Sequence, residues 1–561
     1  MKLNRQFQWI ATAGLVLLIA LASPILLSKP SQSEAPEAPT ETAAALQAPV
    51  LSNLGSYTFP ISTTNEQAQR YFNQGMILAY GFNHAEAFRS LQAATKLDSN
   101  CAMCHWGMAY VLGPNINAAM EAADVPTAYE EIQQAIALKS HATQRERAYI
   151  DVLAQRYSAD RVEDRTDLDL AYAEAMGDLS EQYPDDPDAA TLYAEALMDT
   201  MPWDYWREDG TAKPETTVVL NTLKSVIERY PDHPAALHFY IHAVEKEHPE
   251  LGIEVADRLR DLVPEAGHLV HMPSHIYIRV GRYHDAVVAN LKAIAADESY
   301  ATQCHAQGLY PVGYMPHNHH FLWFSAVMAG QSNIAIEAAH HTAMMADKTL
   351  IREPGYGTLQ HYASIPLYTL VKFEQWDKVL AQPAPDDDLA YPTAVWHYAR
   401  GMAFASKQQI QAAAQALETL EEIVESPALE GVTIWDINTT RDLLQISHAV
   451  LSGEISVQKG DLEAAIASLQ RGVALEDALN YDEPSPWYSP VRQRLGAVLL
   501  QANRPNEAEA TFRADLEVYP NNGWSLYGLT QALTAQGKTE AAQQSQSEFE
   551  IVWQYADIEA G

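Results

Sequence analysis

Residues 491–520 read VRQRLGAVLLQANRPNEAEATFRADLEVYP. This stretch has a small residue at Gly496, a second twelve positions later at Ala508, a large apolar residue at Phe512 and a proline at Pro520. Small residues let two helices approach closely, and a proline cannot continue the helix before it. The spacing therefore predicts two helices that pack together as a pair.

The same spacing recurs along the chain. A first copy contains Gly75 and Leu91, and a middle pair, Gly252 and Ala286, lies in a strict 34-residue phase. Further matches, some weaker, are Tyr240, Ser274, Gly107, Ala194, Trp323, Gly401, Gly453 and Gly528. This period resembles that of tetratricopeptide repeats. Because a helix pair cannot bury its apolar face alone, the resemblance implies an all-α solenoid, a superhelical array of helix pairs with one concave groove.

Length and charge agree with an array. The chain has 561 residues, too many for one ordinary core, and 47% of them are hydrophobic. Its 72 acidic and 36 basic side chains give a net charge of −36, which repels phosphate backbones. We therefore expect no nucleic-acid partner.

The amino terminus predicts export. Lys2 and Arg5 precede an apolar run over residues 9–27, so residues 1–28 are expected to be a signal peptide or an N-terminal membrane anchor. The protein would then be periplasmic or otherwise extracytoplasmic. Residues 29–60 are predicted as a flexible linker rich in Pro, Ala and Glu, residues 61–380 as the motif-bearing array, and residues 381–561 as C-terminal repeats.

Two of the three cysteines lie together in CAMCH (101–105). Cys101, Cys104 and His105 match the CxxCH signature of c-type haem attachment. The two sulfurs could instead form a local disulfide or bind a soft metal ion, since both would lie one turn apart on a repeat helix. All three alternatives stay open at the level of sequence.

Histidines form a larger group of candidate ligands than the cysteines. His238 and His242 are four residues apart on one predicted first helix, and His271 and His275 repeat that spacing on the next. Such pairs can chelate one ion from a single helix face. The remaining candidate ligands are His268, His317 and His320. Imidazole suits Cu, Zn or Fe, so we expect a transition-metal site in the groove. Pro273 should lie in a first helical turn, which would leave His268 before the helix and pointing elsewhere.

Other groups supply weaker signals. Glu195 and Asp199 fall one turn apart on a repeat helix, and together with Glu245 they are candidate bases should the site be catalytic. The aromatic segment MPWDYWREDG (201–210) interrupts the repeats and is expected to fold over the groove, as a lid, a stacking platform or a plug.

Several long strings between residues 71 and 339 are specific. They are CAMCxWG (101–107), GPNIN (113–117), PWDYW (202–206), HFYIHAVE (238–245), GHLVHMPSHIY (267–277) and PHNHHFLW (316–323). In these strings the chain resembles a group of exported bacterial tetratricopeptide-repeat proteins of unassigned activity. The resemblance implies a shared fold and groove and supplies no reaction. In that group the position of His105 is often Tyr or Phe, which argues against haem.

Three functions follow as hypotheses. The first is an exported binding protein whose concave groove holds a transition metal or haem through cysteine and histidine residues. The second is a scaffold that docks a protein or peptide in the groove without a cofactor. The third is a metalloenzyme, which would need an open coordination position and a base.

Overall fold

The computed structural model describes residues 48–304 and 308–560. The predicted signal peptide or membrane anchor, residues 1–28, and the first part of the predicted linker lie outside these residues. Within them, no helix has both the length and the apolar character needed to cross a bilayer.

Helices account for nearly all the regular structure of the described residues. The α-helices are α1 (Glu66–Tyr80), α2 (His84–Leu97), α3 (Ala102–Val111), α4 (Val125–Ala137), α5 (Gln144–Leu153), α6 (Thr166–Gln182), α7 (Pro187–Asp199), α8 (Pro214–Arg229), α9 (Pro234–Val244), α10 (Ile253–Leu259), α11 (Gly267–His271), α12 (Pro273–Arg279), α13 (Tyr283–Cys304), α14 (Met315–Met328), α15 (Ser332–Met345), α16 (Gly357–Lys372), α17 (Trp376–Ala381), α18 (Ala390–Ser406), α19 (Ile410–Val424), α20 (Thr440–Gln458), α21 (Leu462–Glu476), α22 (Val491–Gln501), α23 (Pro505–Val518), α24 (Gly523–Ala535) and α25 (Thr539–Val552). Single helical turns span Lys139–His141, Ala154–Arg156, Pro249–Gly252, Tyr310–Tyr314, Leu350–Arg352 and Pro427–Leu429. One antiparallel hairpin joins β1 (Thr433–Ile434) to β2 (Asn438–Thr439).

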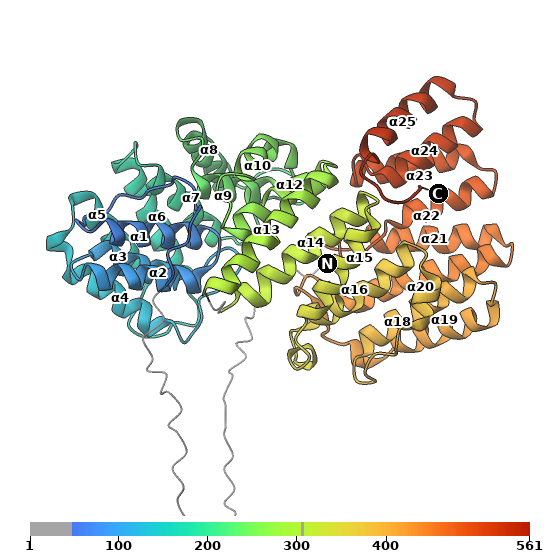
Figure 1. Cartoon of the computed structure of the whole chain (residues 1–561), viewed down its shortest axis with the longest axis horizontal. Coiled ribbons are helices and arrows are strands. Elements are labelled where there is room, and N and C mark those ends of the chain that lie inside the picture. Colours follow the sequence, from blue (N-terminus) through green and yellow to red (C-terminus); the bar gives the residue numbers. More distant parts are fainter. Residues whose placement is uncertain (1–47, 305–307, 561) are drawn as a thin grey trace, which may run out of the picture.

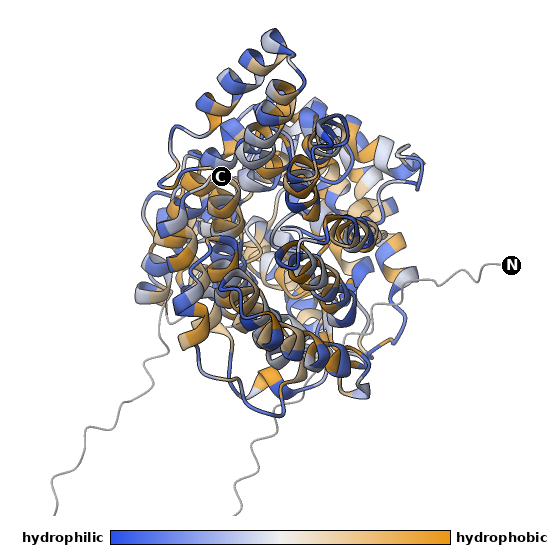
Figure 2. Ribbon diagram, turned by 90° about the vertical axis from the view of Figure 1, so that its right-hand side faces the viewer, coloured by the Kyte–Doolittle hydropathy of each residue, from blue (hydrophilic) through white to orange (hydrophobic). Residues whose placement is uncertain are grey.

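Consecutive helices pack as pairs, and each pair contacts the next, so the array runs from α1 to α25 (Figure 1). Apolar residues lie mainly where helices face each other, and hydrophilic residues lie mainly on the outer faces (Figure 2). The stack continues without a break across residue 380, where α16, α17 and α18 contact one another. The prediction of an all-α, tetratricopeptide-like solenoid is confirmed.

Glycines in the first helix of each pair leave room for the large side chain sixteen residues later. A Cβ atom on Gly496 would lie 2.4 Å from Cζ of Phe512, and one on Gly528 would lie 2.2 Å from it. The ring therefore occupies space that only glycine leaves free on the first helices of two successive pairs. Leu91 is held in the same way between Gly75 and Gly107, where added Cβ atoms would lie 2.6 and 2.8 Å from its side chain. The large residue sixteen positions after each glycine thus locks one helix pair to the next.

Polar side chains cap the N-terminal ends of several helices. The Asn65 side chain accepts hydrogen bonds from two backbone N–H groups at the start of α1, and Asp186 does the same for α7. Thr143 and Glu146 form a reciprocal capping box at the start of α5. These contacts satisfy N–H groups that have no partner inside the helix, and so they fix where each helix begins.

The described end of the predicted linker differs from expectation. Within residues 48–60, Ala48, Leu51 and Phe59 are buried. The Tyr71 hydroxyl donates to the Ala48 carbonyl at 2.8 Å, and the Leu51 N–H donates to Oε1 of Gln74 at 2.8 Å. Composition alone missed this strap because a few apolar residues in a polar segment suffice to dock it on α1.

The C-terminal repeats fold back onto the middle ones. Trp524 Nε1 donates to the Val327 carbonyl at 3.0 Å, and an added Cβ on Gly281 would lie 2.1 Å from the Pro520 carbonyl oxygen. The Asp557 carboxylate also accepts a bond from the Ser332 N–H at 2.6 Å. This closure brings the loop between α21 and α22 against α12.

Glu476, at the end of α21, is a buried carboxyl group that should make the stability of the folded protein depend on pH. Its Oε2 accepts from the Val491 N–H at 2.9 Å, but its Oε1 meets no hydrogen-bond partner among the described residues. Burial raises the pKa of this carboxyl from its ordinary value of 4.5 to about 8. Its contribution to stability is therefore complete below about pH 4.5 and is lost as the pH rises to about 8.

We expect Glu476→Gln to be more stable than the unaltered protein at pH 8.5, by a few kcal/mol at about 1.4 kcal/mol per pKa unit. At pH 4 the two proteins should be equally stable. Denaturant unfolding at both values measures the difference. Glu463→Gln, in the same helix with an 80% exposed side chain, is the matched control and should show no such divergence. An equal effect at both pH values would contradict the burial argument.

Candidate metal centre

Six histidines from three successive helix pairs converge. His238 and His242 lie on α9, His268 and His271 on α11, His275 on α12 and His317 on α14. His268 precedes the helix that begins at Pro273, but it points towards the other histidines, as its prediction as a ligand required. A separate short helix, α11, precedes Pro273 and directs both His268 and His271 inward.

The first of two triads comprises His238, His242 and His268. Their candidate ligand nitrogens all lie within 4.8 Å of one another, and all three side chains are buried. His238 Nδ1 lies 2.7 Å from the Tyr80 carbonyl oxygen, so this nitrogen carries the proton and donates it. The Nε2 atoms of His238 and His242 and both ring nitrogens of His268 have no hydrogen-bond partner in the described part of the chain. Buried polar atoms without partners are costly, which makes this triad a candidate ion site.

The second triad comprises His271, His275 and His317, again with ligand atoms within 4.8 Å of one another. Nδ1 of His271 lies 2.7 Å from Oδ1 of Asn290, whose amide nitrogen donates to the Ala286 carbonyl. The amide orientation is thereby fixed, so His271 must donate from Nδ1, and its Nε2 is left with a lone pair.

That lone pair faces another imidazole. Nε2 of His271 lies 3.0 Å from Nε2 of His275, while Nδ1 of His275 lies 2.6 Å from Oε2 of Glu483 and 3.2 Å from Oε2 of Glu245. With both Nδ1 atoms donating, the two Nε2 atoms need a cation between them, either a proton or a metal ion. Two nitrogens on one tetrahedral zinc ion lie about 3.3 Å apart, close to the observed separation.

Glu245 and Glu483 supply the negative charge of the centre. Glu245 lies directly after α9, and its Oε1 is 3.2 Å from Nδ1 of His242. It therefore contacts one histidine of each triad. Burial alone would raise the pKa of Glu245, but His275 and His242 outweigh burial and hold this pKa at about 2.

The imidazoles differ in charge. Burial lowers the pKa of four of them well below the usual 6.5, and neighbouring imidazoles lower these pKa values further. These four are His238, His268, His271 and His317. Burial also lowers the pKa of His275, but the Glu245 and Glu483 carboxylates outweigh it and raise that pKa to about 10. Neutral imidazole is the form that binds metals, so these four histidines need not lose a proton to bind an ion at neutral pH.

Aromatic rings enclose the centre. Phe82 lies 4.9 Å from the His238 ring and 5.2 Å from the His268 ring, and Phe321 lies 4.7 Å from the His271 ring. Trp203, from the 201–210 segment, lies 5.2 Å from the His242 ring. Its neighbours Tyr205 and Trp206 are buried, and Trp206 Nε1 donates to the Ala243 carbonyl. The segment therefore packs on α9 and covers the histidines from one side.

His320 lies apart from the six converging histidines. It stacks on Trp323 with ring centroids 5.3 Å apart and lies 5.7 Å from the His361 ring. The candidate ion sites found among the described residues do not include it. The prediction that His320 joins the others is not borne out by its position, because it lies on the side of α14 that faces α16.

Glu195 and Asp199 belong to another network. The Tyr110 hydroxyl lies 2.6 Å from Oε2 of Glu195, and Arg156 Nη2 lies 2.6 Å from Oδ2 of Asp199. Both carboxylates are thus tied to buried partners on neighbouring helices, an arrangement that holds the N-terminal repeats together.

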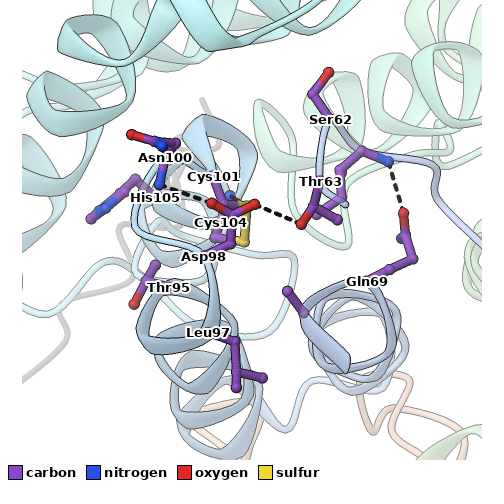
Figure 3. Close-up of a disulfide and its surroundings, with 12 residues drawn as sticks. Ser62, Thr63, Gln69, Thr95, Leu97, Asp98, Asn100, Cys101, Cys104 and His105 are labelled. Carbon is purple, nitrogen blue, oxygen red and sulfur yellow. Dashed lines mark hydrogen bonds between the residues drawn. A yellow bond between two sulfur atoms is a disulfide. The ribbon is translucent and has the colours of Figure 1, made fainter. Parts of the chain in front are cut away.

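Cys101 and Cys104 are joined as a disulfide, one of the three alternatives that the sequence left open. Both are buried, and Cys101 caps the start of α3 (Figure 3). Asp98, three residues earlier, accepts a hydrogen bond from the Thr63 hydroxyl, which precedes α1, at 2.6 Å. His105 lies beside Glu131, with Nδ1 2.6 Å from the carboxylate. A disulfide uses both sulfurs that thioether bonds to haem would need, so this geometry does not fit haem.

Sequence reasoning missed several groups that orient the cluster. Asn290 fixes His271, the Tyr80 carbonyl fixes His238, and Glu483 binds His275 from 208 residues away. Asn290 lies nineteen residues after His271, close to the sixteen-residue step between paired helices, and that spacing could have indicated it. Glu483 had no comparable signal, because only the fold-back of the C-terminal repeats brings it there.

No known protein-family profile matches the chain, and no curated protein sequence matches it. Solved helical-repeat structures are similar at low levels. The tetratricopeptide-repeat domain of P58(IPK) has 11% identity and a TM-score of 0.23, covering 84% of this chain and 99% of that one. Yeast Tom70 has 11% identity and a TM-score of 0.26, covering 85% and 90%. A human IFIT1 dimer with m7Gppp-AAAA has 11% identity and a TM-score of 0.29, covering 88% and 91%. We transfer no function from scores this low.

Proposed function

We propose that this chain is a tetratricopeptide-like binding protein that holds a transition-metal ion in its buried histidine cluster. The observation that carries the proposal is the set of buried ring nitrogens on His238, His242 and His268 that have no partner within residues 48–304 and 308–560. Beside them, the Nε2 atoms of His271 and His275 face each other. A cation bound in either triad would satisfy the lone pairs that face it.

The donor set favours particular ions. Imidazole nitrogens suit Zn, Cu or Fe, whereas hard ions such as Ca²⁺ and Mg²⁺ prefer oxygen ligands. Nδ1 of His238, His271 and His275 donates to a carbonyl, an amide and a carboxylate oxygen, respectively. The Nε2 atom of each of these rings is therefore left to face the centre of the cluster. Such outer contacts hold a ligand ring in position and raise its basicity.

We also propose that the protein works outside the cytoplasm, as its N-terminal sequence predicts. The Cys101–Cys104 disulfide supports this location, because structural disulfides persist in oxidising compartments. Docking of a protein or peptide segment in the concave groove remains the alternative function, and a metalloenzyme activity a third.

Elemental analysis tests the metal proposal. Full-length protein, purified without chelators and desalted, should contain at least one equivalent of Zn, Cu or Fe. The double variant His271→Ala with His275→Ala should contain less metal than wild type, because two adjacent ligands disappear while His238, His242 and His268 remain. His320→Ala removes a buried histidine outside the cluster and should keep the wild-type content.

Circular dichroism would verify that the variants remain helical. Metal-free wild-type protein that also fails to take up Zn²⁺, Cu²⁺ or Fe²⁺ would overturn the proposal and leave the docking scaffold. A visible Soret band that disappears in Cys104→Ser would instead support haem and contradict the disulfide.

A further inference from the structure

The cluster contains two candidate ligand sets made of histidines alone. His238, His242 and His268 form one group, His271, His275 and His317 form the other, and the two share no residue. A third candidate set, Glu245, His275 and Glu483, shares His275 with the second triad. Each histidine triad offers three nitrogens within 4.8 Å of one another. Three imidazoles are the protein ligand set of many open zinc sites, so neither triad needs the other to hold an ion.

The triads lie side by side. The rings of His268 and His271 are 5.7 Å apart, and those of His242 and His275 are 5.9 Å apart. The sequence produces this adjacency because α11 carries one histidine for each triad three residues apart, on one face of a single turn.

One carboxylate serves both triads. Glu245 presents Oε1 to Nδ1 of His242 at 3.2 Å and Oε2 to Nδ1 of His275 at 3.2 Å. It accepts a hydrogen bond from Nδ1 of His242, whereas Nδ1 of His275 donates to Oε2 of Glu483 at 2.6 Å and has Glu245 only as a charged neighbour. In both rings a carboxylate therefore holds Nδ1, which leaves Nε2 for the triad. The Glu245 side chain has an exposed fraction of 1%, so water does not screen its charge from these two rings.

From this arrangement, and resting on the metal-binding function proposed above, we infer a two-ion centre in which each triad binds one transition-metal ion and the Glu245 carboxylate lies beside one ligand of each. Three protein ligands leave at least one coordination position on each ion for water or a small anion. Ions in neighbouring positions would accept such a ligand between them, a feature of two-metal sites. Small oxygen-donor anions are therefore the class of ligand that this centre would take.

Metal titration tests the number of ions. Full-length protein stripped with a chelator, then given Zn²⁺ and desalted, should retain two equivalents. His238→Asn with His268→Asn should retain one, and His271→Asn with His317→Asn should also retain one, because each pair disables a single triad. Asparagine is chosen since it keeps a polar side chain of smaller volume in each buried position.

Loading with Cu²⁺ gives a second measurement. In wild-type protein two adjacent Cu²⁺ ions should interact magnetically, and the electron paramagnetic resonance signal should integrate to less than the copper content or show a half-field transition. Either triad variant should give the ordinary signal of isolated Cu²⁺, with one spin per copper ion.

The outcomes separate the two proposals. Retention of neither Zn²⁺, Cu²⁺ nor Fe²⁺ by the wild type overturns metal binding itself. Retention of one equivalent, removed by variants of only one triad, keeps metal binding and overturns the two-ion centre. Two equivalents that neither triad variant reduces would place the ions elsewhere and overturn both proposals.

Discussion

Phe512→Ala should lower the free energy of unfolding of the C-terminal repeats by about 3–5 kcal/mol, the cost typical of removing a buried phenylalanine. The Phe512 ring fills the space left by Gly496 and Gly528 and so contacts the first helices of two pairs. Alanine would leave a cavity at this junction, and neither glycine has a side chain that can fill it.

Denaturant unfolding followed by tryptophan fluorescence would measure this loss, because Trp524 and Trp553 both lie in the C-terminal repeats. Phe549→Ala is the matched control. That ring is only half-buried, packing on Trp553 in the last helix, and its removal should cost clearly less. Equal losses of unfolding free energy in the two variants would show that the glycine-lined junction stabilises the repeats no more than other contacts do.

The same junction explains why the fold could be predicted from sequence. The repeat pattern consists of contacts between residues sixteen positions apart, such as Gly75 with Leu91 and Gly496 with Phe512. These contacts are local, so a single sequence reveals them. The pairwise stacking of helices then follows, because each pair must cover the apolar face of its neighbour.

The site was predictable only where its ligands share a helix. His238 with His242, and His271 with His275, follow from the four-residue spacing of one helical face. The effect expected of Pro273 on the orientation of His268 was wrong, because the chain forms a separate short helix before this proline. The contact of Glu483 with His275 exists only because the C-terminal repeats fold back. This fold-back results from small rotations between successive helix pairs, and no short sequence pattern indicates their size.

Zn²⁺ should stabilise the chelator-treated protein strongly. An ion that binds only the folded state adds RT ln(1 + [ligand]/Kd), about 2.7 kcal/mol at a hundredfold excess over Kd and about 4.1 kcal/mol at a thousandfold excess. Without the ion, Nε2 of His238, Nε2 of His242 and the two ring nitrogens of His268 stay buried with no hydrogen-bond partner among the described residues. Coordination of one nitrogen of each ring removes most of this cost. Denaturant midpoints with and without Zn²⁺ would measure the gain.

His271→Ala with His275→Ala should lose much of this gain, since it disables one triad, while His320→Ala should keep all of it. The double variant without zinc also separates metal binding from simple packing. It leaves Glu245 and Glu483 buried without the imidazolium between them, so it should be less stable than metal-free wild type. If zinc shifted the midpoints of wild type and double variant equally, the ion would be binding to other parts of this acidic protein. The histidines would then be polar lining of a docking groove, with His275 protonated between its two carboxylates.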